Sequence, residues 1–562
     1  MTDLLSLPPG EVLRRKRALL RELGEAGPFT PVRIALLGGS TIGEIEPLLR
    51  LFLLAYGIDP VFFIGQYDRW YEEVVFEDPA LVTFKPDIVW IHVTFRNAGD
   101  PEALGDKLVA AWDTLGSPVI LQNNIELPPY RVMGNRDASH GLLGRIEALN
   151  RRIAEAAVAR SKFYINDIHW LSAQIGLDVW YDDALWYTAK YACSLEALPL
   201  LCGNTARIVK SLLGKNQKAL ALDLDNTLWG GVVGDDGAEG LEQTSDTPRG
   251  MAFSEFQSYI KAVSALGIPL AIVSKNDPDT ALTGFSKALL KPEDFSAVYA
   301  NWRNKDANLR AAASDLNLGT DSLVFIDDNP AERALVRASF PNTAVPELSG
   351  PETYIRALDR AGYFEVTAQT PDDTLRVASY KAERERRSGA FADYGEFLRS
   401  LKMKATFGPV NRSNQARVTQ LINKTNQFNL TTRRLPEAEV EALSEDPGTV
   451  TLCGSLSDTF GDSGLVTVLF ASVDGPTACI ELWVMSCRVF KRGLEFAALR
   501  RLLEILRERG TATVQGRFLP TAKNGPVKDL YRELGFTSLD GEVWEAPIDS
   551  VRIPETFMEV RR

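Results

Sequence analysis

The stretch KALALDLDNTLWGGVVGDDG, residues 218–237, decides the fold of the middle of this chain. Its apolar run, Ala219 to Leu222, has the character of a buried strand, and two acids, Asp223 and Asp225, follow it directly. Side chains alternate along extended backbone, so we expect the two acids to point the same way. Open α/β sheets keep their sites at the carboxyl ends of strands, and we expect phosphate chemistry at this edge.

Two further strands are predicted to end at the same edge. IPLAIVSKND (268–277) ends its apolar run at Ser274, and SLVFIDDNPAER (322–333) ends at Asp327 and Asp328, with Lys305 in NWRNKDANL (301–309) between them. Carboxylate oxygens are the hard ligands that Mg²⁺ prefers. The metal ligands predicted here are Asp223, Asp225, Asp327 and Asp328.

These motifs resemble those of the haloacid dehalogenase (HAD) family, whose signature DxDx[TV] is matched by DLDNT (223–227). The resemblance implies that Asp223 attacks phosphorus, Asp225 shuttles the proton, Ser274 hydrogen-bonds the phosphoryl group and Lys305 holds the negative charges together. Substrate-binding candidates in the same motifs are Thr227 and Asn276. Taken singly, a helix-capping Ser274 and a solvated Lys305 remain open.

A longer set of motifs is similar to the FkbH-like branch of that family. The set comprises LWGGVVGDDG (228–237), SKND (274–277), FIDDNPAER (325–333) and KTNQFNLTTRR (424–434). The resemblance, from about residue 160 to the C-terminus, implies that a glyceryl unit is loaded from 1,3-bisphosphoglycerate onto the phosphopantetheine of an acyl carrier protein, as in polyketide pathways. Mg²⁺ is the implied cofactor.

Length and composition set the remaining bounds. A chain of 562 residues exceeds a single core, so three to four domains are expected. The net charge of −12 argues against nucleic acid as a partner. The N-terminus lacks a signal-peptide pattern and no apolar run is long enough to span a membrane, so neither export nor membrane insertion is expected. Scattered cysteines without metal spacing favour free thiols in a reducing cytoplasm.

Before the HAD-like motifs, the chain alternates predicted strands and helices. A helical segment (1–30) precedes a doubly wound α/β domain (31–200), in which Ser40, Asn97 and His169 follow the first, third and fifth strands. This arrangement is similar to SGNH hydrolases. The surrounding motifs differ from that family, however, so we favour a helix-capping Ser40, a packed His169 and a docking role for the domain.

The remaining boundaries follow from changes of pattern. The HAD-like domain covers 201–365 and has no room for a separate cap domain between Asp225 and Ser274. A charged helical linker (366–400) leads to an α+β domain (401–562) that resembles GNAT acyltransferases. Its turn SCRVFKRGLE (486–495) replaces the usual glycine pattern, and Arg488, Lys491 and Arg492 are candidates to bind pantetheine phosphate.

Cys487 lies in that turn, beside cationic residues and before a predicted helix N-terminus, which favours a reactive thiolate. The hypothesis is that an acyl phosphate acylates Cys487, that Asp223 removes the remaining phosphate, and that glycerate passes to the carrier thiol. Other candidates for the acyl site are Thr425, Asn426, Asn429, Arg433 and Asn524, with Tyr531 as a general acid by resemblance to GNAT proteins. Structural roles for these residues are equally open.

Two alternatives from other classes are open. One is a HAD phosphatase that acts on a small phosphorylated metabolite, with the flanking domains as scaffold. The other is a non-catalytic adaptor that binds phosphorylated partners. The intact set of acids, serine and lysine argues against the adaptor.

Overall fold

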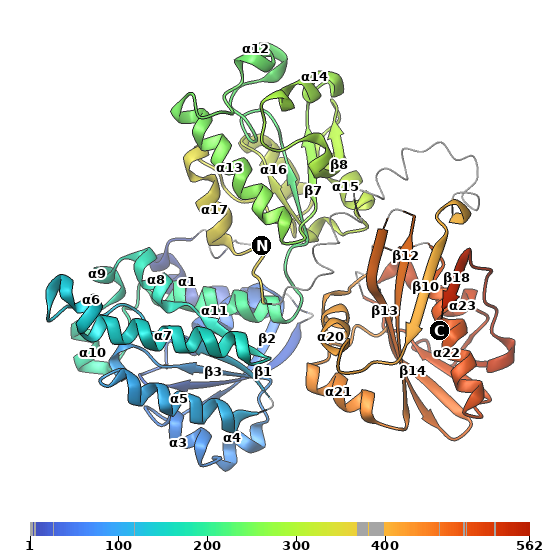
Figure 1. The fold of residues 1–562 in the computed structure, drawn as a ribbon, viewed down its shortest axis with the longest axis horizontal. Helices are drawn as coiled ribbons and strands as arrows, with labels where there is room; N and C mark the ends of the chain where they lie inside the picture. Colours follow the sequence, from blue (N-terminus) through green and yellow to red (C-terminus); the bar gives the residue numbers. More distant parts are fainter. Residues whose placement is uncertain are drawn as a thin grey trace. The chain divides into compact units, whose positions relative to one another are not determined.

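The computed structural model describes residues 4, 7–25, 27, 29–116, 118–367, 380, 398–459, 461–486, 489–490, 492–521 and 524–561. The chain divides into two compact units, Met1–Leu212 and Leu213–Arg562. Three separate sheets lie in these units, one in the first and two in the second (Figure 1). The chain is therefore a multidomain α/β protein, as predicted.

The first unit is built on a parallel five-stranded sheet of order β2-β1-β3-β4-β5. The strands are β1 (Thr30–Gly38), β2 (Ile58–Ile64), β3 (Ile88–His92), β4 (Val119–Asn123) and β5 (Phe163–Asn166). Strand order reverses direction at β1 and β3, which is the doubly wound topology predicted for this region. The principal helices are α1 (Pro9–Gly24), α2 (Ile45–Ala55), α5 (Pro101–Leu115), α7 (Leu142–Ala159), α8 (Ile168–Ile175), α9 (Leu177–Trp180), α10 (Asp183–Ala189) and α11 (Leu198–Leu212), with the short α3 (Trp70–Val75), α4 (Pro79–Phe84) and α6 (Asp137–His140) between them.

Helix α11 belongs to this unit, which moves the predicted boundary at residue 200 to Leu212. The helix packs against α1 and α2, and the Cys202 thiol contacts the Ile45 carbonyl. Nearly the whole helix is buried. Helix α1 (Pro9–Gly24) likewise packs on α2 and belongs to the same core, although the sequence predicted a separate N-terminal segment.

The second unit begins with a parallel four-stranded sheet of order β8-β7-β6-β9. Its strands are β6 (Ala219–Leu222), β7 (Leu270–Ser274), β8 (Phe295–Ala300) and β9 (Leu323–Ile326). Helices α12 (Val233–Gly240), α13 (Pro248–Ala265), α14 (Pro278–Thr283), α15 (Lys305–Asp315), α16 (Pro330–Ser339) and α17 (Tyr354–Ala361) cover it. Helix α13 starts at Pro248 because the Thr247 hydroxyl accepts a hydrogen bond from the Gly250 N–H.

Between Asp225 and Ser274 the chain forms only a glycine-rich hairpin with α12, then α13 and β7. Gly230 and Glu242 bridge the two arms of this hairpin. No additional sheet or helical bundle is inserted between these two described residues, which is the arrangement that the sequence predicted.

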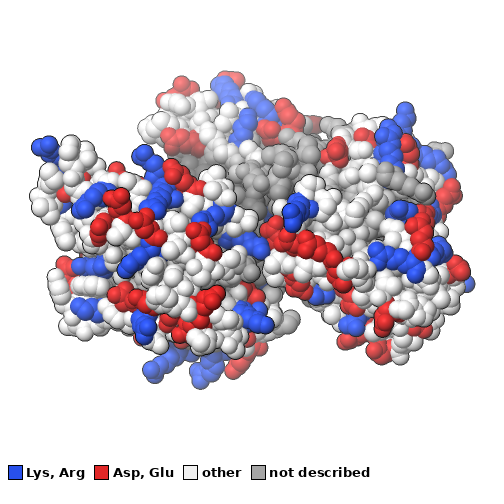
Figure 2. All heavy atoms as spheres, turned by 60° about the horizontal axis from the view of Figure 1, so that its bottom comes forward, with Lys and Arg blue, Asp and Glu red and all other residues white. Residues whose placement is uncertain are grey.

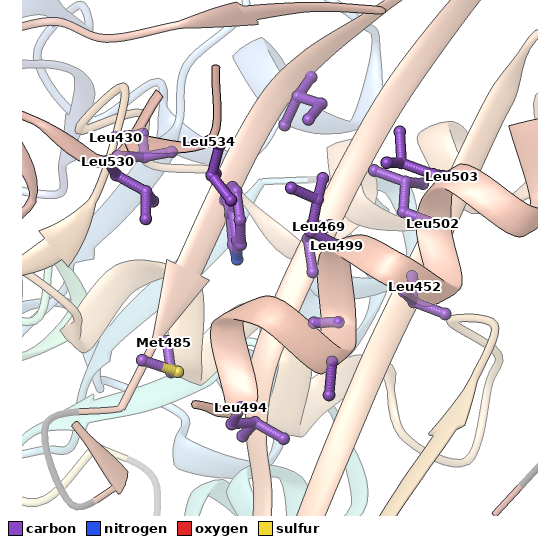
Figure 3. Close-up of a cluster of buried hydrophobic side chains, with 14 of the residues drawn as sticks. Leu430, Leu452, Leu469, Met485, Leu494, Leu499, Leu502, Leu503, Leu530 and Leu534 are labelled. Carbon is purple, nitrogen blue, oxygen red and sulfur yellow. The ribbon is translucent and has the colours of Figure 1, made fainter. Parts of the chain in front are cut away.

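The third sheet has nine strands in the order β16-β17-β15-β14-β13-β12-β10-β18, with β11 paired to β14. The strands are β10 (Met403–Gly408), β11 (Phe428–Asn429), β12 (Thr449–Asp458), β13 (Gly461–Asp474), β14 (Thr477–Met485), β15 (Thr513–Arg517), β16 (Thr537–Ser538), β17 (Val543–Pro547) and β18 (Met558–Arg561). Helix α22 (Leu494–Glu508) packs its leucines on one face (Figure 3), and α20 (Gln415–Lys424) and α21 (Glu437–Glu445) cover the other; α23 (Leu530–Glu533) follows β15.

The predicted linker, 366–400, lies almost wholly outside the described residues. Among the described helices none is long and apolar enough to cross a membrane. Acidic and basic side chains are interspersed on the face drawn in Figure 2, in keeping with the composition. The thiols of Cys193, Cys202, Cys453 and Cys479 are free.

Candidate active site

The site lies where the second sheet reverses its strand order. Strand β6 lies between β7 and β9, so the residues that follow β6 and β9 meet at one edge. Asp223 follows β6, and Asp327 and Asp328 follow β9. One carboxylate oxygen from each of these three acids lies within 4.8 Å of the others.

Lys305, the first residue of α15, joins two of the three acids. Its Nζ lies 2.9 Å from Oδ2 of Asp223 and 2.5 Å from Oδ2 of Asp327, and all three side chains are buried. Burial alone would lower the pKa of Lys305, but the attraction of the two carboxylates outweighs it and raises the pKa. Lys305 is therefore a buried cation at the site and not a solvated surface charge.

One lysine does not balance the acids. Burial and the charge of Asp223 raise the pKa of Asp327 to about 7, and the same two causes raise the pKa of Asp328. Such shifts arise where buried carboxylates lack positive charge. The donor set fits Mg²⁺: three converging hard oxygens whose excess negative charge a divalent cation would neutralise.

The Asp225 carboxylate lies outside this group of three, so among the four predicted metal ligands it is the one whose side chain does not join the group. Its Oδ1 accepts from Trp229 Nε1 at 2.9 Å and from the Val233 N–H at 3.0 Å, and its Oδ2 accepts from Asn276 Nδ2 at 2.9 Å. Strand β6 ends at Leu222, so the alternation of side chains does not extend to Asp225. A positive φ of 55° at Asn226 then turns the chain into the hairpin.

The two predicted substrate-binding residues of this edge, Thr227 and Asn276, contact the acids. Thr227 Oγ1 accepts a hydrogen bond from the Asp328 N–H at 3.0 Å, and Asn276 donates to Asp225 as described. Ser274 is the last residue of β7 and is buried, and its carbonyl accepts from the Asn301 N–H at 3.1 Å. A helix cap is not its role, because Asp277 caps α14.

Two residues that were given no role in the sequence also shape the site. Trp229 is fully buried, packs edge-on against Phe285 and fits only because Gly284 has no side chain, since a Cβ there would lie 2.6 Å from the indole. Arg333 Nη1 donates to the carbonyls of Asp327 at 2.8 Å and Asp328 at 2.7 Å. Both occur inside quoted motifs, but neither contact is visible from residue type or spacing.

The SGNH-like residues of the first unit each follow a different strand of the sheet. Asn97 Nδ2 donates to the Gly39 carbonyl at 2.8 Å, beside the buried Ser40. His169 follows β5 and lies in the first turn of α8. Its Nδ1 faces the Ile125 carbonyl at 3.1 Å. Ser40 caps no helix, because Glu44 occupies that position before α2.

In the third sheet, Cys487 and Arg488 lie outside the described residues, as does Lys491. Arg492 is buried and its Nη1 pairs with Asp458 Oδ2 at 2.9 Å, so its charge is already matched. Tyr531 is buried against Gly516, and burial raises the pKa of its hydroxyl well above the ordinary value. A general acid needs contact with its substrate, and in this structure the Tyr531 side chain is buried in the domain core.

The other acyl-site candidates are engaged within the domain. Asn426 accepts from Arg434, and Arg433 forms a surface ion pair with Glu439. Asn524 is fully buried, and its Nδ2 donates to the carbonyls of Asn429 at 3.0 Å and Leu519 at 2.8 Å. These contacts are structural, which was the alternative that the sequence left open.

No protein-family model matches the chain, and a search of curated proteins finds no match. Among solved structures, the chain is similar to the N-terminal part of the protein BF1531 from Bacteroides fragilis, which contains a phosphatase domain complexed with Mg. Identity is 28%, the match covers 63% of this chain and 98% of that one, and the TM-score is 0.58. Residues 201–365 are less than a third of the chain, so the similarity extends beyond the HAD-like domain.

Other matches are shorter. The ribosomal-protein-S18-alanine N-acetyltransferase from Escherichia coli is 17% identical over 26% of this chain and 94% of its own, with a TM-score of 0.21. A putative acetyltransferase from Salmonella typhimurium, yncA, covers 27% of this chain and 98% of its own, with a TM-score of 0.21. The first match therefore shows that a large part of this chain is similar in fold to a solved structure that contains a phosphatase domain.

Proposed function

We propose that this chain is a Mg²⁺-dependent phosphoryl-transfer enzyme in which Asp223 is the nucleophile. The observation that carries the proposal is the buried Lys305, which bridges Asp223 and Asp327 inside a group of three converging carboxylates. The likeness to a phosphatase-containing protein crystallised with Mg supports the same reading. Asp223, Asp327 and Asp328 would hold the ion, which neutralises phosphoryl oxygens when bound.

The residues divide the reaction between them. An oxygen of Asp223 forms a bond to phosphorus while the bond from phosphorus to the leaving oxygen breaks. Asp225, held apart from the metal group by Trp229, Val233 and Asn276, gives that oxygen its proton and later takes one from the attacking water. Lys305 pairs with the Asp223 carboxylate and orients it.

The test is phosphate release from small phosphomonoesters by the full chain, with Mg²⁺ and with chelator. Asp223→Asn should lower the rate by at least about a thousandfold, since it removes the nucleophile. The exposed Asp279→Asn, in the same domain, should leave it unchanged. Full activity of the Asp223 variant would refute the assignment.

We propose further that the substrate is a phosphorylated three-carbon acid such as 1,3-bisphosphoglycerate, and that its acyl group is loaded onto an acyl carrier protein in the cytoplasm. The support is the set of long motifs and the thiol of Cys487 in its cationic turn. The thiolate would attack the acyl phosphate carbon and release phosphate, and thioester exchange with the carrier thiol would follow.

Intact-protein mass spectrometry tests this finer proposal. Wild type and Cys487→Ala are incubated with Mg²⁺ and 1,3-bisphosphoglycerate generated in situ, with and without holo carrier protein. A glyceryl adduct that requires Cys487 and moves to the carrier supports transfer. Phosphate release without any adduct, unchanged in the variant, would leave a small-molecule phosphatase.

A further inference from the structure

Strands β14 and β15 form a parallel pair along only part of their length. The pairing runs from Thr477–Thr513 to Ile480–Gly516, after which β14 continues to Met485 without β15 beside it. Diverging parallel strands expose backbone groups on their facing edges, which need other partners when buried. The gap between the two strands is therefore a place for an extended chain.

Residues 428–430 fill this gap. Phe428 and Asn429 pair antiparallel with Met485 and Val484. The Leu430 N–H donates to the Trp483 carbonyl at 3.2 Å, and the Leu430 carbonyl accepts from the Leu519 N–H at 2.8 Å. Leu430 thus joins β14 to the chain that follows β15, and it contributes to the buried cluster that also holds Met485 (Figure 3).

Buried polar side chains hold the segment in place. Asn429 Nδ2 donates to the Thr425 carbonyl at 3.2 Å, and its Oδ1 accepts from the Thr432 N–H at 2.8 Å. Asn524 donates to the Asn429 carbonyl from the other side. Arg434 donates to the carbonyls of Ile422 and Thr425, and its pKa falls to about 10 because it is buried. Phe428, Asn429 and Leu430 are each at most 2% exposed.

We infer that residues 428–430 are a fixed internal segment that closes the gap between β14 and β15 against an extended ligand, held by the contacts of the flanking residues 425–434. The C-terminal domain therefore does not admit the pantetheine chain of coenzyme A or of a carrier protein along this edge of β14. An acyl acceptor would reach the carboxyl end of β14, next to Ser486, from outside the sheet. The inference goes beyond the phosphoryl-transfer function and narrows the route for the acyl transfer proposed with it.

Hydrogen exchange of the full chain tests the inference. The Leu430 and Leu519 amides should be as protected as those of β13, and about 1 mM acetyl-CoA or 4′-phosphopantetheine should change neither their exchange nor the heat of titration. Saturable binding of either probe together with faster exchange at 428–430 would overturn the inference, because it would show a displaceable segment.

Matched asparagine variants show that the reporter is sensitive. Asn524→Ala removes the donor to Asn429 and should speed exchange at 428–430 by about tenfold or more. Asn411→Ala removes contacts to Ser413 and Asn414 in an exposed turn and should leave 428–430 unchanged. Equal exchange at 428–430 in both variants and in wild type would contradict the role of Asn524. If Asn524→Ala fails to fold, the test with acetyl-CoA and 4′-phosphopantetheine still stands, because it uses the wild-type chain. Phosphate release is measured in the same samples. It shows whether the proposed phosphoryl-transfer function holds, independently of the exchange result at 428–430.

Discussion

Single hydrogen bonds decide how the acids of the second sheet differ in role. Asp223 and Asp225 are two positions apart, but the first faces Lys305 and the second faces Trp229. Residue type and spacing predicted which acids gather at the edge. They did not predict which acid would be withdrawn from the metal group, because that depends on the indole N–H of Trp229, on Asn276 and on the turn at Asn226.

We expect Trp229→Phe to lower kcat by about tenfold to a hundredfold with little change in KM. Phenylalanine keeps the packing on Phe285 but loses the donor to Asp225, a charge-assisted bond whose loss costs about 1.5–3 kcal/mol. Steady-state kinetics measure the split. Trp302→Phe, at a 75% exposed position, is the control and should behave as wild type; an unchanged kcat in Trp229→Phe would remove the indole from the mechanism.

Lys305→Met should destabilise the second unit by about 3–5 kcal/mol in chelator, because it leaves buried carboxylates without their cation. Mg²⁺ should restore part of the loss. Denaturant unfolding measures both values. Lys287→Met breaks an exposed pair with Glu239 and should cost no more than about 1 kcal/mol. If the two variants were equally mild, the buried pair would not stabilise the site.

Glu126 of the first unit predicts a pH dependence of stability. It is fully buried, and this burial raises its pKa to about 7 although its Oε2 accepts from the Phe95 N–H. A folded-state pKa above the unfolded value means that stability is greatest below about pH 4.5 and falls as pH rises through about 7. A shift from 4.5 to about 7 corresponds to about 3 kcal/mol.

Glu126→Gln should therefore stabilise the first unit relative to wild type, and this gain should be larger at pH 8 than at pH 5.5. The pH profile of the variant should be flatter than that of wild type. Thermal unfolding at both pH values checks this. The exposed Glu147→Gln should keep the wild-type slope. A variant profile as steep as that of wild type would assign the slope to other groups.

At the scale of elements, local pattern predicted most of the parallel strands. The apolar runs before Asp223, Ser274 and Asp327 are β6, β7 and β9, and their order around the switch point places the acids together. The motif KTNQFNLTTRR was identified in the sequence, where a place in an acyl site and a structural role were equally open. Its structural role depends on pairing between Phe428 and Met485. The residues of the motif alone do not predict this pairing, because Met485 is far away in the sequence.

Helix α11 shows the same limit. The predicted boundary at residue 200 assigned most of it to the next domain, but α1 and α2 provide a surface that buries it. The position of a domain boundary depends on which core a helix packs against, and hydrophobic periodicity reports that a face is buried without naming the partner.

At the scale of the whole molecule, the division into two units predicts that ligand binding stabilises them unequally. The three carboxylates that fit Mg²⁺ belong to the unit Leu213–Arg562, and Glu126 belongs to Met1–Leu212. A ligand that binds only the folded form of one unit raises the stability of that unit, by about 2.7 kcal/mol at a hundred times Kd. Calorimetry of the full chain should show two transitions, of which Mg²⁺ raises one and Glu126→Gln at pH 8 raises the other. Asp223→Asn should weaken the Mg²⁺ response without moving the Glu126-dependent transition. A single transition that responds to both changes would mean that the two units unfold cooperatively. The division at Leu212 would then describe how the contacts are distributed, but the two units would not be independently stable.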